Sequence, residues 1–572
     1  MKFKLNQLAP YSKHYLENLL LNRGIIDVND FLFPDESALL PEEDFDNMTK
    51  AWNILIENWH KGMLILVDCD ADGYTSAAVM WQYLKDKFPS AKMEYILHEG
   101  KQHGLEDTYK DVLDSECGLI IIPDASSNDE EYHKMLVEEG KTILVLDHHE
   151  AEKYSQFATV VNNQLSVRYE NKFLSGVGVV YKFCKYVDKM DGTNFADKYL
   201  DLVAVGMIGD MMKITSSENR YLYKRGLSNI TNFGLQKLIE KQAFSIGDTT
   251  HLTPTKISFY IAPLINALIR VGKMSEKEVL FKSLIEGDTL VPSTKRGAKD
   301  GAVESLGEQN ARNCTNARSR QNRAKEKAMD LLEMEICKNS LDENKIIIVE
   351  VEDDAIDTTL TGLVAMNLVS KYKKPVLVVR EDSEGFLKGS GRGTDKSELK
   401  DLKQFLIDSG YFQFAEGHAN AFGVSIHKSN VDKFTAYANE KLKDVNFNEG
   451  VYEADFLFDC EDEELITAID QIGSRPELWS QGNDEPYFAI TDIKLSCDDT
   501  SVIGKNADTL RFVKNGVTYV MFKAARLIEE VQGKTEFSLE IVGRANLNEW
   551  AGTVSPQIMI EDYNLRNTLL EF

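Results

Sequence analysis

The chain has 572 residues, of which 43% are hydrophobic and 27% are charged. This balance is typical of globular protein, excludes wholesale disorder and collagen-like repetition, and at roughly 150 residues per domain indicates about three or four domains. The formal net charge is −27, because 92 Asp and Glu oppose 65 Lys and Arg. Such a charge argues against a nucleic-acid partner, since phosphate binding is driven by cationic side chains. A mean charge hides its distribution, however, so this objection stays open.

Membrane insertion and disulfide bonding are not expected. No apolar run approaches the roughly 18 to 20 residues that span a bilayer, and the beginning of the chain lacks the apolar stretch of a secretion signal. The seven cysteines are scattered and contain no C-x-x-C pair, so neither a disulfide framework nor a structural zinc site is expected. We expect an intracellular protein with no membrane partner.

A short helical opening is predicted over residues 1–60, and apolar runs of strand length follow it. Each run ends near a carboxylate: Met63–Val67 before Asp68, Leu119–Ile122 before Asp124, and Ile143–Leu146 before Asp147. Short apolar strands that alternate with helices predict a parallel α/β sheet covered on both faces. Ligands of such sheets bind at the carboxyl ends of the strands, so the three acids predict a site.

A long helix is predicted within residues 295–345, because residues 304–339 lack Pro and hold one Gly near their start. Residues 295–327 carry nine cations and four acids, a local charge of +5. A solvated connector helix and a basic wall beside nucleic acid both agree with this charge. On this stretch alone the connector is favoured.

The rest of the chain predicts a second α/β unit and then a β-rich unit. Between them, residues 449–470 hold nine acids and no Lys or Arg, which indicates a boundary. The predicted elements are strands at Lys345–Val349, Pro375–Val379, Val517–Phe522 and Phe537–Val542, and a helix at Leu360–Tyr372. The predicted domains are 1–60 (helical opening), 61–290 (α/β), 291–345 (connector helix), 346–448 (second α/β) and 449–572 (β-rich).

Three acids alternate after the first predicted strand, at Asp68, Asp70 and Asp72, and Gly73 follows them. An EF-hand calcium loop is excluded, because the expected glutamate and the paired flanking helices are missing. An ordinary surface turn remains an alternative, since Asp-Gly is common in turns. Carboxylates that converge at a strand end repel one another unless a cation neutralises them, so the pattern favours a metal.

Two histidines follow the third strand-end acid, in the sequence Asp147-His148-His149. A single histidine is more often a satisfied core residue, but two beside an Asp at a strand end favour a ligand. Carboxylate with imidazole suits Mn²⁺ or a related divalent ion. Asp124 and Asp210 are further candidates, because an Asp buried at the end of an apolar run is destabilising if it has no partner.

The order of these motifs resembles the DHH phosphoesterase superfamily. Three later stretches are similar to motifs of the RecJ single-strand exonucleases and their DHH-associated domain: Asn266–Arg270 (NALIR), Gly389–Gly393 (GSGRG) and Glu416–Gly423 (EGHANAFG). Residues 479–486 (WSQGNDEP) and 548–550 (NEW) resemble the OB-fold domain of those enzymes. The resemblance covers essentially the whole chain. It implies an α/β fold with a parallel-sheet DHH domain, a connector helix, an α/β DHH-associated domain and a C-terminal OB-fold.

The resemblance also implies a site with two divalent ions, Mn²⁺ or Mg²⁺, which activate a water and stabilise the departing 3′ oxygen. The implied metal ligands are Asp68, Asp70, Asp124, His148 and Asp210. Asp72 and Asp147 would support this cluster, and His149 would face the scissile phosphate. Two groups of residues would hold the substrate: Asn266 and Arg270 near the metals, and Ser390, Arg392 and His418 around the terminal nucleotide and its 5′ phosphate.

The chain departs from the family pattern at three positions. Gly393 stands where the family usually has a second Ser, which removes a hydroxyl from the implied pocket. Glu416 stands where it usually has Gly, and a carboxylate there could repel a 5′ phosphate. The Asp124 motif reads PDASSN, where many relatives have Gly after the acid. None of these changes alters an implied metal ligand.

The function that the resemblance implies is metal-dependent hydrolysis of single-stranded DNA from the 5′ end to 5′ mononucleotides. Single-strand binding protein and a helicase are candidate partners beside single-stranded DNA itself, and the implied location is the cytoplasm of a bacterial cell or a phage-infected bacterium. One alternative is a DHH phosphodiesterase of short oligonucleotides or cyclic dinucleotides, although such relatives generally lack an OB-fold. Another is a non-catalytic DNA-binding replication scaffold, which should have lost metal ligands. We expect a mostly acidic exterior with a basic groove whose affinity for single strands falls steeply with salt.

Overall fold

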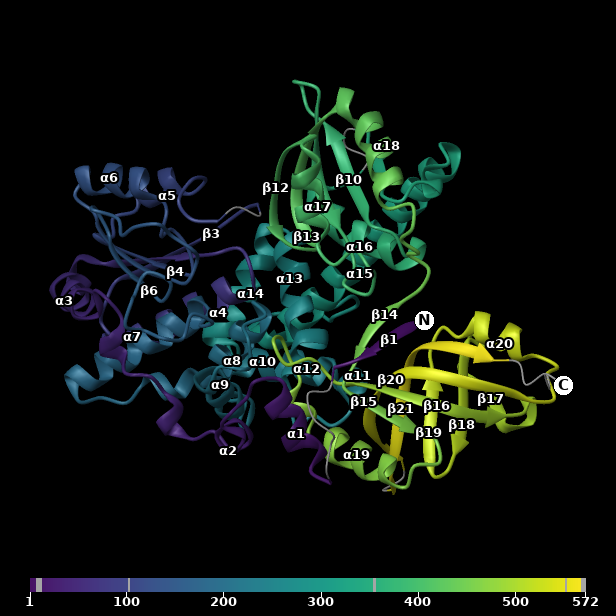
Figure 1. Cartoon of the computed structure of the whole chain (residues 1–572). Coiled ribbons are helices and arrows are strands. Elements are labelled where there is room, and N and C mark those ends of the chain that lie inside the picture. Colours follow the sequence, from purple (N-terminus) through teal and green to yellow (C-terminus); the bar gives the residue numbers. More distant parts are fainter. Residues whose placement is uncertain (7–12, 101–102, 353–355, 551–552, 567–572) are drawn as a thin grey trace. The chain divides into compact units, whose positions relative to one another are not determined.

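The computed structural model describes the chain except residues 7–12, 101–102, 353–355, 551–552 and 567–572 (Figure 1). The chain divides into two compact units. The larger unit consists of Ile25–Arg320 and Pro476–Asp484, and the smaller unit consists of Met1–Gly24, Gln321–Arg475 and Glu485–Phe572.

A five-stranded sheet in the order β3-β2-β4-β5-β6 forms the centre of the larger unit (Figure 1). Every pairing in it is parallel, which confirms the predicted parallel α/β sheet. All residues of β2 and β4 are buried, as expected for strands covered on both faces. The strands are β2 (Met63–Val67), β3 (Met93–Leu97), β4 (Leu119–Pro123), β5 (Thr142–Asp147) and β6 (Thr159–Asn162).

Alternate strand residues pack into two different cores, because successive side chains of a strand point to opposite faces. Ile65 of β2 packs in a cluster with α4 (Ala71–Lys87) and α7 (Gly176–Asp191). Leu66, the next residue of β2, packs on the opposite face with α5 (Tyr109–Asp114) and α6 (Glu130–Glu138). Burial of each such aliphatic side chain stabilises the fold by roughly 1.5–3 kcal/mol. The two cores fix the sheet, and with it the positions of the strand ends.

Further helices of the larger unit surround α4 and α7. Residues Ile257–Ile261 form a π-helical turn directly before α13. The helices are α2 (Val28–Leu32), α3 (Met48–Asn58), α8 (Leu200–Gly209), α9 (Ser217–Leu227), α10 (Phe233–Lys241), α11 (Ala243–Ile246), α12 (Pro254–Lys256), α13 (Ala262–Val271) and α14 (Met274–Glu286).

The predicted long helix is α15, Leu306–Lys338, but it begins later than residue 291. The residues before it form an antiparallel hairpin of β7 (Leu290–Pro292) and β8 (Val303–Ser305). Arg312 of α15 lies 2.6 Å from Glu304, so part of the positive charge of this stretch is neutralised locally. Five of its cations form no ion pair with a described residue: Arg296, Lys299, Arg323, Lys325 and Lys327.

The smaller unit contains a mixed five-stranded sheet in the order β12-β13-β11-β10-β9. The predicted strands and helix of the second α/β unit are confirmed, with ends shifted by one or two residues. The elements are β9 (Ile347–Glu350), α16 (Thr361–Tyr372), β10 (Val376–Glu381), β11 (Phe386–Arg392), α17 (Leu402–Ser409), β12 (Phe412–His418), β13 (Ala421–His427) and α18 (Val431–Lys441).

A seven-stranded sheet in the order β15-β16-β20-β21-β19-β18-β17 follows in the same unit, which confirms the predicted β-rich region. Its strands are β15 (Phe456–Asp459), β16 (Tyr487–Leu495), β17 (Thr500–Ile503), β18 (Thr509–Lys514), β19 (Val517–Met521), β20 (Phe537–Trp550) and β21 (Thr553–Arg566). Two helices, α19 (Glu464–Gly473) and α20 (Ala525–Val531), accompany it.

The opening of the chain is not wholly helical, contrary to the prediction. It begins with β1 (Lys2–Leu5), which pairs in parallel with β14 (Val451–Ala454), and only then continues into α1 (Tyr15–Asn22). Lys2–Leu5 alternates polar and apolar residues, as a strand does. Its partner lies about 450 residues away, so no local pattern indicates the pairing.

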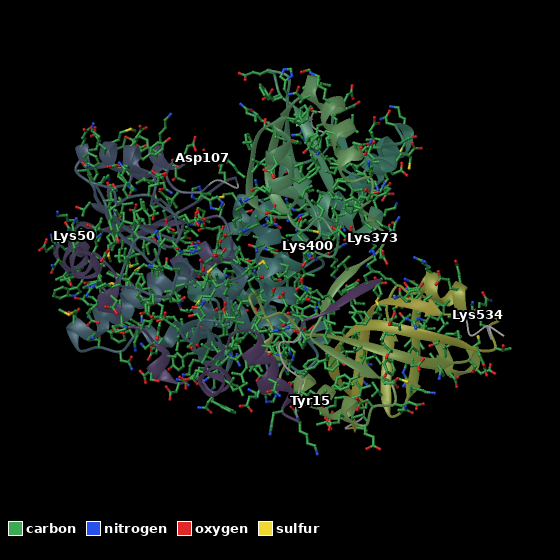
Figure 2. All side chains as sticks on the ribbon, viewed as in Figure 1. Tyr15, Lys50, Asp107, Lys373, Lys400 and Lys534 are labelled. Carbon is green, nitrogen blue, oxygen red and sulfur yellow. The ribbon has the colours of Figure 1, made fainter. Side chains whose placement is uncertain are left out.

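Charged side chains point outward from both units, as Lys50 of the larger and Lys373 of the smaller illustrate (Figure 2). Among the described residues, no helix has the length and apolar character needed to cross a membrane.

Candidate metal centre

The first acids of the site lie in the turn between β2 and α4. Asp68 follows the buried strand, and Asp70 caps the helix by accepting a hydrogen bond from the Gly73 N–H at 2.9 Å. A Cβ atom on Gly73 would lie 2.6 Å from the Asp68 Cβ. Glycine at this position therefore allows the helix to begin directly against Asp68.

Asp124 follows β4 with a φ of +64°, the left-handed backbone region that non-glycine residues rarely adopt. Its carboxylate lies against the first residue of α7, since a Cβ on Gly176 would be 2.2 Å from Asp124 Oδ1. Unusual backbone geometry persists where surrounding structure fixes it, and such positions cluster at functional sites.

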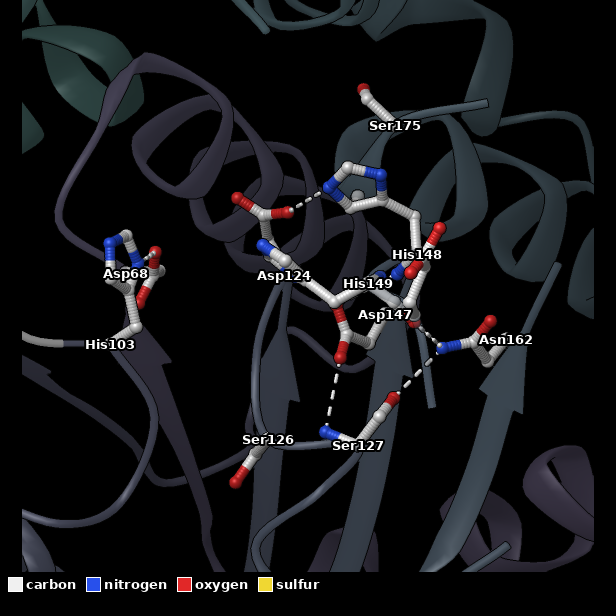
Figure 3. Close-up of polar contacts among 12 residues, drawn as sticks. Asp68, His103, Asp124, Ser126, Ser127, Asp147, His148, His149, Asn162 and Ser175 are labelled. Atoms are coloured by element: carbon white, nitrogen blue, oxygen red, sulfur yellow. Dashed lines mark hydrogen bonds and ion pairs between the residues drawn. The ribbon is translucent and has the colours of Figure 1, made fainter. Parts of the chain in front are cut away.

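Asp147 ends β5 and is completely buried. Its carboxylate accepts hydrogen bonds from the N–H groups of Ser127 (3.0 Å), His148 (2.7 Å) and His149 (3.2 Å), and from His149 Nδ1 (2.8 Å; Figure 3). Burial acts to raise the Asp147 pKa, but the hydrogen bond and charge of His149 hold it below its ordinary value. Asp147 thus orients the His149 ring and fixes the main chain of both histidines, and each of its oxygens accepts a hydrogen bond.

His148 faces two further acids. Its Nε2 lies 3.2 Å from Asp124 Oδ1 (Figure 3) and 3.5 Å from Asp210 Oδ2. Asp210 directly follows the last residue of α8. Burial, assisted by the charge of His149, lowers the pKa of His148 to about 4. The imidazole is therefore neutral at pH 7, and its contacts to the two acids are not ion pairs.

Asp72 is bound to the start of α7. It accepts hydrogen bonds from Ser175 Oγ (2.9 Å) and from the Gly176 N–H (2.7 Å). Gly206 of α8 allows this approach, because a Cβ there would lie 2.1 Å from Thr75 Oγ1 and 2.8 Å from Asp72 Oδ1. Asp72 thereby connects the beginnings of α4 and α7.

These side chains form overlapping groups in which one ligand atom of each residue lies within 4.8 Å of the others. The groups are Asp68, Asp70 and Asp124; Asp72, His148 and Asp210; and Asp124, His148 and His149. The structure therefore brings together all five residues implied as metal ligands.

The electrostatics of the cluster fit a divalent cation. Burial, reinforced by the charges of neighbouring acids, raises the pKa of Asp72, Asp124 and Asp210. One buried oxygen each of Asp68, Asp124 and Asp210 accepts no hydrogen bond from the described residues. The oxygens of Asp124 and Asp210 face His148 Nε2 at 3.2 and 3.5 Å without a hydrogen bond. Buried carboxylate oxygens that accept no hydrogen bond are costly, and a metal ion would remove both this cost and the repulsion. Carboxylates with a neutral imidazole are suitable ligands for Mn²⁺, and carboxylates for Mg²⁺.

Asn266 of α13 adjoins the cluster. Asn266 Oδ1 accepts a hydrogen bond from the Ala71 N–H at 3.0 Å, which ties α13 to the start of α4. Arg270 lies one turn further along, near enough to Arg318 of α15 that its charge, after burial, lowers the Arg318 pKa. The sequence placed Arg318 only within a basic stretch. Two neighbouring guanidinium groups favour an anion between them.

His103 was not predicted as a site residue. Its Nδ1 lies 2.6 Å from Asp68 Oδ2 (Figure 3). It follows β3, which pairs with β2 and so ends at the same edge of the sheet. The signal for it was weak, because His98 rather than an acid directly follows β3, and His103 lies six residues beyond the end of the strand.

The remaining predicted residues lie in the smaller unit, on one face of a sheet. Ser390 of β11 and Glu416 of β12 both pair with Gly423 of β13. Two positions along, Arg392 and His418 both pair with Ala421 of β13. Directly paired residues and residues two apart in a strand point to the same face, so these four side chains share one face. Ser390 Oγ also lies 3.0 Å from Thr361 Oγ1 of α16.

Comparison with known proteins agrees with this geometry. Residues 62–207 match the model of the DHH family N-terminal domain, and residues 460–562 match that of the RecJ OB domain. A Bacillus subtilis (strain 168) protein named "Putative SPbeta prophage-derived single-strand DNA-specific exonuclease YorK" is 36% identical over 99% of both chains. The chain belongs to the RecJ family of DHH proteins.

More distant relatives have the same organisation. The single-stranded-DNA-specific exonuclease RecJ of Bacillus subtilis is 27% identical over 87% of this chain and 61% of that protein. The crystal structure of RecJ from Thermus thermophilus in complex with Mn²⁺ has a TM-score of 0.73 at 21% identity, covering 99% of this chain and 80% of that one. This likeness shows that the fold is that of RecJ.

Proposed function

We propose that this chain is an exonuclease that degrades single-stranded DNA from the 5′ end and releases 5′ mononucleotides. The observation that carries the proposal is the cluster of buried acids around a neutral histidine. Three of these acids each have a carboxylate oxygen that accepts no hydrogen bond from the described residues. Relatives at 36% and 27% identity are named as single-strand DNA-specific exonucleases, which supports the substrate class. We expect the protein to act in the cytoplasm, and assistance by single-strand binding protein or a helicase stays a prediction.

In this proposal two divalent ions, Mn²⁺ or Mg²⁺, are held by Asp68, Asp70, Asp124, His148 and Asp210. When bound, such ions lower the pKa of a water and neutralise charge on the phosphate. The Thermus thermophilus RecJ structures were determined in complex with Mn²⁺ and with Mg²⁺, which supports these two metals.

The protein side chains then position the substrate. Asp147 holds His149 through Nδ1, which leaves Nε2 of this half-exposed ring to donate to a phosphoryl oxygen as its charge increases. Asn266 fixes the start of α4 beneath the acids. Arg270 and Arg318 supply guanidinium groups for the phosphates that follow, since their planar forks match phosphate geometry.

The test is digestion of single strands labelled at either the 5′ or the 3′ end, with Mn²⁺, with Mg²⁺ and with a chelator. We expect labelled mononucleotide first from the 5′ label, only with metal, and little from duplex. Label released first from the 3′ end would refute the polarity. Asp124→Asn should abolish turnover, whereas the exposed control Glu57→Gln should retain it.

The same assay separates the alternatives. Cleavage of dinucleotides with long strands left intact would favour a phosphodiesterase of short oligonucleotides, against which the matched RecJ OB domain argues. Strand binding without turnover, in protein verified to bind Mn²⁺, would favour a non-catalytic scaffold.

A further inference from the structure

A second set of ligand-type side chains adjoins the acid cluster, at the carboxyl ends of β2 and β3. It consists of Asp68, Cys69 and His103, which each offer one atom within 4.8 Å of the others. The Cys69 Sγ lies 3.7 Å from each ring nitrogen of His103, and His103 Nδ1 lies 2.6 Å from Asp68 Oδ2. His103 and Asp68 lie to one side of Asp124 and His148 (Figure 3).

The distances of this set suit tetrahedral zinc. With Zn–S near 2.3 Å and Zn–N near 2.1 Å, a tetrahedral ion holds sulfur and nitrogen about 3.6 Å apart, close to the separation of Cys69 and His103. The same geometry requires about 3.4 Å between nitrogen and carboxylate oxygen, so His103 must move from Asp68 by about 0.8 Å. The His103 side chain is 48% exposed, which leaves it free to make this shift.

Independent observations point to a missing ligand. The Asp68 side chain is 1% exposed, and its Oδ1 accepts no hydrogen bond from a described residue. His98, which follows β3 and is 3% exposed, has no hydrogen bond to a described residue at either ring nitrogen. Leu97 pairs with Val67, so His98 and Asp68 leave neighbouring strands at the same level. Buried polar atoms are normally hydrogen-bonded, and two such side chains at one edge favour a bound ion.

The loop that carries His98 is fixed by a buried lysine. Lys277 Nζ donates to the main-chain oxygens of His98 (3.2 Å) and Glu99 (2.6 Å). The main chain at His98 and Glu99 is therefore held in place before any ion binds.

We propose that Asp68, Cys69 and His103 bind Zn²⁺, and that His98, which leaves the neighbouring strand at the same level as Asp68, supplies the fourth ligand. A thiolate with an imidazole selects Zn²⁺ over Mg²⁺ and Mn²⁺, which prefer oxygen-rich sites. Binding displaces to solvent the proton of the Cys69 thiol and the Nδ1 proton that His103 shares with Asp68 Oδ2. Asp68 belongs to both this site and the acid cluster, so Zn²⁺ bound here competes for a ligand of the catalytic ions and acts as an inhibitor; the inhibition rests on the proposed exonuclease function, whereas the binding does not.

Co²⁺ is the spectroscopic probe for this site, because a thiolate ligand gives Co²⁺ a charge-transfer absorption. We expect this band in the full-length protein, its loss in Cys69→Ser, and its retention in the control Cys337→Ser, which removes an exposed thiol. Competition with a chromophoric chelator should show zinc affinity lower by more than about tenfold in both Cys69→Ser and His103→Gln. Equal zinc affinity in wild type and His103→Gln, a substitution of a half-exposed residue, would overturn the proposal even if Cys69→Ser does not fold.

The inhibition is measured by adding Zn²⁺ to protein digesting single strands in Mn²⁺. We expect half-inhibition at a Zn²⁺ concentration more than about tenfold lower in wild type than in His103→Gln, each relative to its own rate without zinc. Equal zinc sensitivity would refute the regulatory role. A thiolate–Co²⁺ band without any nuclease activity would refute the proposed function and leave the zinc site standing, whereas activity without the band would do the reverse.

Discussion

The contact between α7 and the Asp124 carboxylate gives a sharp test of the metal centre. In Gly176→Ala the new Cβ would lie 2.2 Å from Asp124 Oδ1 and 2.5 Å from its Cβ and Cγ, far inside van der Waals contact. Gly176 cannot retreat easily, because its N–H donates to Asp72 at 2.7 Å. Overpacking of this kind costs about 1–3 kcal/mol, which corresponds to roughly a 5- to 150-fold loss of metal affinity if Asp124 is the group that moves.

The assay is calorimetric titration of Mn²⁺ together with thermal unfolding. Gly178→Ala is the matched control, since its Cβ would meet the Leu174 side chain at 2.5 Å in the same helix but would not touch an acid. We expect both variants to be less stable and only Gly176→Ala to bind Mn²⁺ more weakly. Equal Mn²⁺ affinity in the two variants would refute the assignment of Asp124 as a ligand.

Three further predictions concern buried groups outside the metal ligands. Asp147→Asn should abolish turnover while Mn²⁺ titration stays within about threefold of wild type, because Asp147 orients the ring of His149, which is not an implied ligand, and belongs to none of the metal-binding groups; loss of Mn²⁺ binding would contradict this. Burial lowers the pKa of His133 to about 4. As pH falls from 6.5 to 4, the unfolded chain takes up a proton that the folded chain excludes, so the free energy of unfolding should decrease by about 3 kcal/mol. Urea unfolding of His133→Gln should lack this decrease, and parallel pH curves for the two proteins would refute it. Lys182→Met should lower the free energy of unfolding by about 3–5 kcal/mol, because it leaves the Glu218 carboxylate, 3.1 Å away, buried without its cation; a loss below about 1 kcal/mol in urea unfolding would be contrary to this reasoning.

Local patterns predicted the parts of the fold and site that depend on one segment at a time. The strands and their terminal acids are visible in the sequence, because a buried parallel strand is a continuous apolar run and its end faces the ligand. The pairing of Lys2–Leu5 with Val451–Ala454 was invisible, since it depends on a contact across most of the chain. His103 was missed for the same reason, because only the order of the sheet brings it beside Asp68.

The departures from the family motif also become interpretable only in three dimensions. A Cβ on Gly393 would lie 2.4 Å from Asn420 Oδ1, and Asn420 Nδ2 donates to the Lys400 carbonyl at 2.8 Å. The Asn420 side chain therefore occupies the space that the hydroxyl of a serine at position 393 would need. The effect of Glu416 on recognition of the 5′ end stays a prediction. Because the Glu416 and Ser390 side chains share one face of the sheet, a phosphate bound at Ser390 would feel the charge of Glu416.

Glu416→Gln should increase the preference for a 5′-phosphorylated over a 5′-hydroxyl single strand. Glu416 and Ser390 are separated by one strand, so a phosphate held at Ser390 would lie roughly 8–10 Å from the carboxylate. At that distance, in a largely aqueous setting, a dianionic phosphate and a carboxylate repel by about 1 kcal/mol, or about fivefold in kcat/KM.

The ratio of kcat/KM for the two ends is the quantity to measure, at low and at high salt. Because both charges are exposed to solvent, the gain should shrink as salt shortens the screening length to a few ångströms. Glu384→Gln, in the exposed turn between β10 and β11, is the control for a general change in net charge. Gly393→Ser should not give the same gain, because the added side chain displaces Asn420 before it reaches the substrate. An unchanged ratio in Glu416→Gln at low salt would refute the idea that this carboxylate sets the preference, and with it the placement of the 5′ phosphate on this face of the sheet.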